Sequence, residues 1–82
     1  MNWNKDSVTK VWTAEDNELG GVTWSIEPPT EARYNMVTLW LISSDLPDIF
    51  HEERVGQFIS VKAAKDWIEK TGRAKYKKVW EV

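Results

Sequence analysis

Hydrophobic and polar residues alternate most regularly between positions 22 and 26. Valine, tryptophan and isoleucine occupy every second position there, and hydroxyl side chains lie between them. This period of two is typical of a strand with one buried face and one solvent-exposed face. The β-branched residues of Val8–Thr13 predict a preceding strand. Turn-forming residues at Asp16–Gly21 predict that the two strands form a hairpin, and Pro28 and Pro29 end the second strand.

The segment Tyr34–Ser43 predicts a third strand that is apolar on both faces. Such continuous apolarity is typical of a strand that is covered on both sides. One helix covers only one face, so we expect additional cover from residues 44–56, from a second copy of the chain or from another protein. This cover would contact either one row of side chains of the strand or the row on its opposite face. The residues of the candidate interface are Val37, Leu39 and Leu41.

The last third of the chain predicts a short strand, a helix and a final strand. Residues 57–59 form the short strand, and residues 49–56 fit either a loop with a helical turn or an irregular strand. Ser60 is a suitable N-cap for a helix over Val61–Thr71, where apolar residues recur at spacings of three and four. Gly72 is expected to end this helix in a left-handed conformation. Alternating apolar residues then predict a strand over Arg73–Val82.

These elements predict a small α+β fold. We expect an antiparallel sheet of three to five strands, with one amphipathic helix packed on one face before the final strand. The chain has 82 residues and a mass of 9.6 kDa, which suits a single domain over residues 1–82 with a thin core. Trp24, Trp40 and Trp67 occupy apolar rows and are expected to meet in that core. The succession from Gln57 to Glu69 resembles small phage and bacterial α+β proteins, in supersecondary structure only.

Composition removes most catalytic chemistry. The chain has no cysteine, so disulfides and zinc–thiolate sites are excluded. His51 is the only histidine, no Gly-x-Ser-x-Gly sequence exposes a serine, and the glycines form no phosphate-binding pattern. His51 with Glu52 and Glu53 is expected to form an exposed acidic segment rather than a metal site. We therefore expect no catalytic residue, no metal and no cofactor.

Hydropathy and the N-terminal residues predict a cytoplasmic chain without a membrane segment. The longest uninterrupted apolar run, Leu39–Ile42, has four residues, whereas a membrane span needs about 18. The first residues lack the charged and then apolar arrangement of a secretory signal.

Charge is divided unevenly along the chain. Residues 1–61 carry a net charge of −6 and residues 62–82 carry +4, which gives the total of −2. The basic C-terminal segment is either a solvated surface or a patch that binds an acidic or phosphate-bearing partner. The chain also has six tryptophans, whose large side chains suit either a small core that needs more buried apolar area or an interface. The residues expected to contact a partner are Lys70, Arg73, Lys75, Tyr76, Lys77 and Lys78.

These features favour a non-catalytic module that binds a macromolecule, most readily a protein, and blocks or bridges it. The small size and divided charge would suit a phage-type inhibitor of a host defence protein. Two alternatives stay open. One is a single-stranded nucleic-acid or RNA-binding accessory protein that uses the basic C-terminal strand, and the other is a structural subunit of a larger assembly. A homodimer is a further way to cover the third strand.

Overall fold

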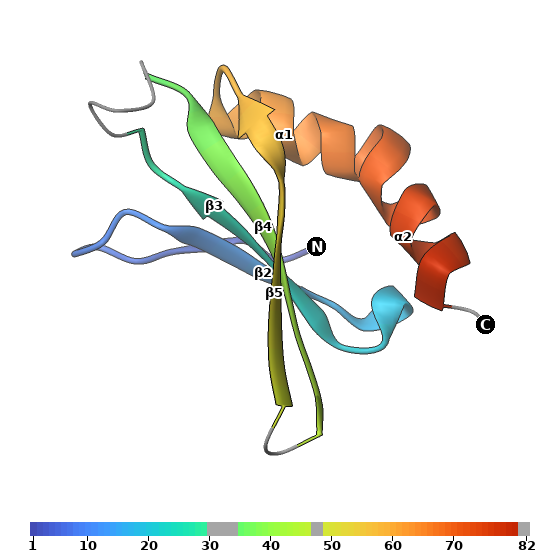
Figure 1. Ribbon diagram of the computed structural model, residues 1–82. Helices are drawn as coiled ribbons and strands as arrows, with labels where there is room; N and C mark the ends of the chain where they lie inside the picture. The colour runs from blue at the N-terminus through green and yellow to red at the C-terminus, as the bar shows by residue number, and fades with distance from the viewer. Residues whose placement is uncertain (30–34, 47–48, 81–82) are drawn as a thin grey trace.

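A computed structural model describes residues 1–29, 35–46 and 49–80, with side chains described for 1–29, 35–43 and 52–76. Five antiparallel strands form one sheet in the order β1-β2-β3-β4-β5, and a helical segment lies on one side of it (Figure 1). The expected α+β fold is confirmed. No helix in these ranges is long and apolar enough to cross a membrane. The strands are β1 (Asn4–Lys5), β2 (Trp12–Asp16), β3 (Val22–Glu27), β4 (Val37–Leu46) and β5 (Ile49–Phe58), and the helical elements after them are α1 (Val61–Trp67), η3 (Ile68–Gly72) and α2 (Arg73–Trp80).

The first predicted strand begins too early. The Asp6 carboxylate accepts hydrogen bonds from the backbone N–H groups of Val8 and Thr9, each at 2.8 Å. These bonds bend the chain into a turn, which Lys10 completes with a φ of 64°. Val8 is therefore 85% exposed at the tip of the turn, and β2 begins only at Trp12.

The predicted hairpin of the next two strands is confirmed. β2 pairs antiparallel with β3, and Ala14 lies opposite Trp24. Between them the 3₁₀ turn η1 (Asn17–Leu19) ends at Gly20, whose φ of 77° is in the left-handed region that favours glycine.

The segment that could not be assigned from its sequence is part of a long strand. Residues 49–58 pair with β4 along its length, so this segment extends the sheet and does not fold over its face. Leu39 lies opposite Gly56 and Trp40 lies opposite Arg54, which leaves Val55 as an extra residue in a β-bulge. The bulge interrupts the regular alternation of side chains, which explains why the sequence pattern here was weak.

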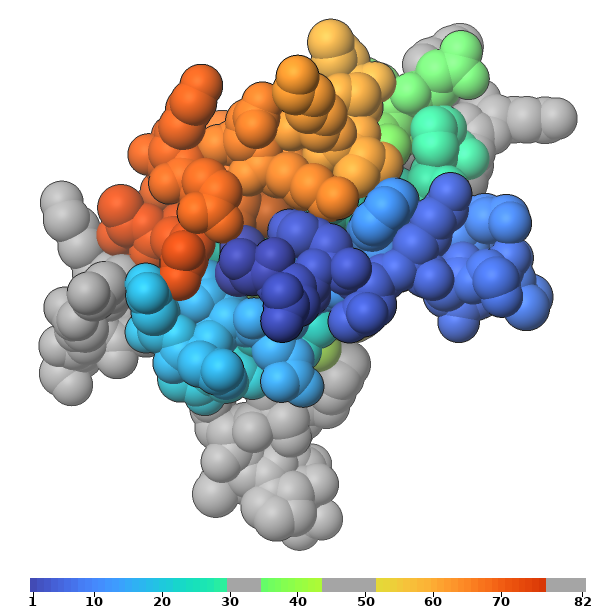
Figure 2. All heavy atoms as spheres, turned by 180° about the vertical axis from the view of Figure 1, so that it is seen from behind, coloured from blue at the N-terminus to red at the C-terminus, as the bar shows by residue number. Residues whose placement is uncertain are grey.

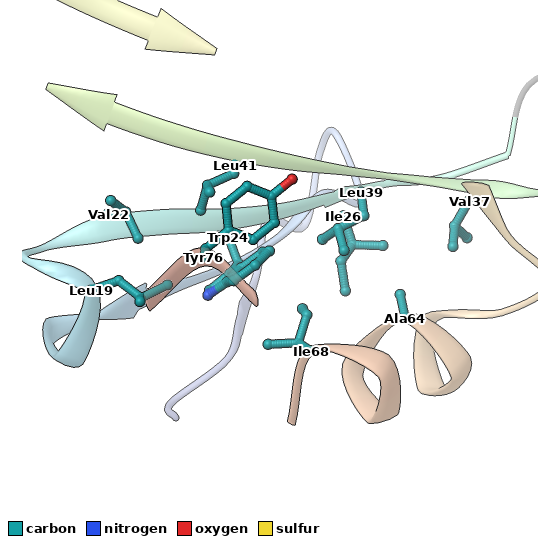
Figure 3. Close-up of a cluster of buried hydrophobic side chains, with 10 residues drawn as sticks. All are labelled: Leu19, Val22, Trp24, Ile26, Val37, Leu39, Leu41, Ala64, Ile68 and Tyr76. Atoms are coloured by element: carbon teal, nitrogen blue, oxygen red, sulfur yellow. The ribbon is translucent and has the colours of Figure 1, made fainter. Parts of the chain in front are cut away.

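The helical segment covers the row of β4 that was expected to need a partner. Val37, Leu39 and Leu41 are all at most 2% exposed, and they pack with Ala64 and Ile68 of the helical segment (Figure 3). In the folded chain these three side chains are core residues and are not available at the surface. The row that faces away from the helices contains Thr38, Trp40 and Ile42.

The expected meeting of three tryptophans is therefore only partly correct. Trp24 is fully buried in the core, and Trp67 is packed against it. Trp40 lies opposite Ser25, and its side chain belongs to the helix-free face of the sheet. Neighbouring residues of a strand point to opposite faces, and Trp40 follows the core residue Leu39 directly.

The predicted N-cap of the helix is confirmed, but the predicted helix end is wrong. The Ser60 hydroxyl accepts a hydrogen bond from the N–H of Ala63 at 3.0 Å. At Gly72 the chain passes through a π-helical turn, in which the N–H of Arg73 donates to the carbonyl of Ile68. The helix then continues as α2, where a final strand had been expected.

A helical stripe explains why residues 73–80 do not form a strand. Ala64, Ile68, Gly72 and Tyr76 are spaced by four, and all four are buried. The apolar alternation that suggested a strand is interrupted at Lys78, whereas arginine, alanine and lysine all favour helices. Burial of Tyr76 on the helical stripe therefore outweighs the weaker strand pattern.

Gly72 is required because two indole rings contact the backbone at this position. A Cβ at Gly72 would lie 2.6 Å from Cζ3 and 3.0 Å from Cε3 of Trp67, and 3.3 Å from Cη2 of Trp24. We expect Gly72→Ala to lower the free energy of unfolding by about 1–3 kcal/mol through overpacking. This sign is diagnostic, because glycine to alanine in an unhindered helix stabilises by about 1 kcal/mol. Urea unfolding measures the change.

Gly56→Ala is the matched control for this substitution. A Cβ at Gly56 would meet only a Phe58 ring carbon at 3.9 Å, which is an ordinary van der Waals contact. We expect a change much smaller than that of Gly72→Ala. Equal stability of Gly72→Ala and the unmodified protein would show that the two indoles do not pack on this glycine.

Candidate functional site

The C-terminal residues predicted to contact a partner do not share one environment. Lys70 and Lys75 are exposed on the helical segment, and the Nζ of Lys75 lies 5.6 Å from the centroid of the Tyr76 ring. The side chains of Lys77 and Lys78 lie outside the described residues. Arg73 is half-buried and Tyr76 is buried, so these two contribute to the interior of the fold.

Arg73 is held by three carboxylates. Its Nε lies 3.0 Å from Oδ2 of Asp16, one terminal nitrogen lies 2.7 Å from Oε2 of Glu18, and the other lies 3.4 Å from Oε2 of Glu69. Burial lowers the pKa of the guanidinium, but the hydrogen bond to Asp16 and the three negative charges outweigh it and raise that pKa above its ordinary value. Arg73 is therefore a charged structural residue with its charge already compensated.

Asp16 is the buried member of this cluster. Its side chain is 0% exposed, and besides the bidentate contact with Arg73 it accepts hydrogen bonds from two more donors. The indole Nε1 of Trp24 donates to Oδ2 at 3.0 Å, and the backbone N–H of Glu18 donates to Oδ1 at 3.2 Å. A buried carboxylate is tolerated only when it is paired and hydrogen-bonded in this way.

Tyr76 links α2 to β5, the edge strand of the sheet that lies opposite β1. Its ring packs edge-on against Trp24 with centroids 5.8 Å apart, as both side chains show in Figure 3. Burial raises the pKa of the phenol, and Glu53 of β5 raises it further by its charge and by accepting a hydrogen bond. Because its ring is buried, Tyr76 does not offer a free face on which a nucleic-acid base could stack.

Two partly exposed tryptophans, Trp3 and Trp12, contact lysines of the same chain. The Nζ of Lys65 lies 3.9 Å from the ring centroid of Trp12 and 5.2 Å from that of Trp3. Lys5 lies 5.6 Å from the centroid of the Trp12 ring. Such cation–π contacts contribute about 0.5–1 kcal/mol each at exposed sites. The two contacts of Lys65 attach Trp3, just before β1, and Trp12 of β2 to α1.

A groove of about 930 Å³ opens beside β2 and η1. In Figure 2 the dark-blue N-terminal residues lie between the lighter blue chain of β2 and η1 and the orange helical segment. Arg73 closes one side of the groove, so the ion-pair cluster forms part of its wall. The lining residues are Met1, Asn2, Asn4, Thr13, Ala14, Glu15, Asp16, Asn17, Glu18, Thr23 and Arg73.

The groove lies beside one edge position of β2, Glu15, at which β1 no longer pairs. The N–H of Asp6 donates to the carbonyl of Val11, so the main-chain groups of Val11 face β1. Main-chain groups alternate in direction along an antiparallel strand, and those of Thr13 and Glu15 therefore face the same edge. Thr13 pairs with Asn4, the first residue of β1. Within the described chain, no main-chain hydrogen bond joins Glu15 to the residues before β1.

The lining groups of the groove are mostly polar. Their amides, hydroxyls and carboxylates supply hydrogen-bond donors and acceptors. Among the residues that the structure describes, no group of three or more His, Cys, Asp or Glu side chains could hold a metal ion. The arrangement can hold an extended polar segment by its main chain.

Sequence patterns did not identify this groove. Asp16 and Glu18 belong to the segment for which the sequence correctly predicts a turn. A turn is enough to explain polar side chains at these positions, so they did not indicate a groove. The missing information is the contact of Asp16 with Arg73, 57 residues away. A scan against protein-family models, a search of curated proteins and a search of solved structures found no match.

The raised pKa of Tyr76 predicts a specific loss of stability in alkali. A phenol whose folded-state pKa lies above its ordinary value of 10.0 stabilises the fold below that value and loses this contribution as the pH rises through the folded-state pKa. We expect the unfolding free energy of the unmodified protein to fall more steeply above about pH 10 than that of Tyr76→Phe. Urea unfolding at a series of pH values tests this. Parallel pH profiles would contradict the burial of the phenol.

Proposed function

We propose that this chain is a non-catalytic protein-binding module that holds an extended segment of its partner in the groove beside β2. The observation that carries the proposal is the unpaired main chain of Glu15 at the edge of the sheet, beyond Asn4, the first residue of β1, where the groove begins. An N–H and a carbonyl that face outward from an edge strand bind an added strand directly. By this contact the module would block or bridge the partner.

The rigidity of the groove wall supports this proposal. Asp16 and Arg73 are fixed by their mutual hydrogen bonds, and Asp16 is also fixed by Trp24 of the core. A binding surface that is held in place before binding loses little conformational freedom when the partner arrives. The end of β2 is therefore well suited to receive a strand without rearrangement.

A protein partner fits these features better than a nucleic acid. Three carboxylates and one guanidinium line the groove, so its side chains carry a net negative charge that repels phosphates. On the helical segment, Lys70 and Lys75 are exposed, but the aromatic residue expected to accompany them, Tyr76, is buried.

Glu15→Pro tests strand addition directly. Proline has no N–H to donate and is tolerated on a strand edge where the N–H faces outward. A random-peptide display library is selected on the unmodified protein, and the enriched peptides are then measured on Glu15→Pro and Glu15→Ala. We expect binding to be lost in Glu15→Pro and to be kept, at most a few-fold weaker, in Glu15→Ala, whose main chain still donates.

Hydrogen exchange on the unmodified protein provides an independent measurement that needs no proline variant. The Glu15 amide should exchange rapidly in the free protein and become protected when an enriched peptide is bound. Failure to enrich any peptide, or enriched peptides that leave the exchange of the Glu15 amide unchanged, would refute the proposed function.

A further inference from the structure

We infer that the segment held in the groove is cationic, with a lysine or arginine beside Glu15 on the helix-free face of the sheet. This inference rests on the proposed function and adds the chemistry of the partner. Glu15 lies opposite Thr23, and both belong to the face that the helices leave uncovered. The Glu15 side chain is exposed, and no ion pair of Glu15 is found among the described residues.

Apart from the amino group of Met1, the other charges of the groove do not offset Glu15. Arg73 is the only basic side chain among the lining residues, and it already contacts the carboxylates of Asp16, Glu18 and Glu69. A partner carboxylate would have to compete with these contacts for the guanidinium. The side-chain charge available to a partner is therefore negative, which attracts cations and repels anions.

Strand geometry defines where the cation must lie. A strand added at the edge of β2 places one of its residues directly opposite Glu15, with Cβ atoms about 4.5–5.5 Å apart. Side chains alternate between faces, so only every second residue of the segment approaches the Glu15 carboxylate. The alternate residues of the bound segment point to the helix-covered face of the sheet, and these residues do not need to be charged.

Three peptides test the sign of the charge. Each has about eight residues, a common strand length, with blocked ends, and alternates threonine with lysine, with glutamine or with glutamate. Fluorescence anisotropy gives each dissociation constant for the unmodified protein, Glu15→Gln and Glu52→Gln. Glu52 is the matched control, because it is also exposed on the helix-free face but belongs to β5 at the other edge.

We expect the lysine peptide to bind the unmodified protein about 1.5- to fivefold more tightly than the glutamine peptide, a range set by one opposite-charge pair. Glu15→Gln should remove most of this preference, Glu52→Gln should keep it, and added salt should reduce it. Equal binding of the lysine and glutamine peptides, or an equal loss in Glu15→Gln and Glu52→Gln, would overturn the inference.

The same experiment separates this inference from the proposed function. If the glutamine peptide protects the Glu15 amide from exchange as well as the lysine peptide does, strand addition stands and the cationic preference is wrong. If none of the three peptides protects that amide, and the library yields none that does, the proposed function itself fails and the inference fails with it.

Discussion

The carboxylate of Asp16 imposes the constraint on which the rest of this structure depends. It is completely buried at the end of β2, and a buried charge without partners costs several kcal/mol. Its principal partner, Arg73, lies 57 residues further along the chain. The pair therefore stabilises only a fold in which the C-terminal helix returns to the second strand, which is the arrangement seen in Figure 1.

This constraint also organises the core. Arg73 is the first residue of α2, and the π-helical turn before it aligns Arg73 with Asp16 while Tyr76 packs on Trp24. Trp24 contributes twice, because its ring fills the core and its Nε1 donates to Asp16. Gly72 allows the indole rings of Trp24 and Trp67 to approach the helix backbone. The ion pair and the aromatic core are thus parts of one packing arrangement.

The groove is a consequence of the same arrangement. Arg73 reaches Asp16 from the helical side, while β1 pairs with β2 over only two residues on the other side. The end of β2 is consequently held in place by the hydrogen bonds of Asp16, whereas the main chain of Glu15 has no partner in β1. The main-chain hydrogen-bonding groups of Glu15 are thereby held in a fixed position, as the proposed recognition of an extended segment requires.

Local patterns in the sequence predicted the parts of the fold that local physics determines. The alternation at Val22–Ile26 and the cap at Ser60 were correctly recognised, because each depends on near neighbours in the sequence. The sequence predicted a strand where α2 forms. Burial of Tyr76 against Trp24 outweighs the weak alternation of apolar and polar residues in this segment. The groove was missed for a similar reason, because Asp16 acquires its role only through Arg73.

A double-mutant cycle on Asp16→Asn and Arg73→Met tests the central claim most directly. The unfolding free energies of both single variants and the double variant give the coupling between the two side chains. Each single change leaves the other group buried or half-buried without its main partner, and we expect a coupling of about 2–3 kcal/mol, with the double variant less destabilised than the sum of the single ones. Additivity within about 0.5 kcal/mol would contradict the account, because the two residues would then stabilise the fold independently.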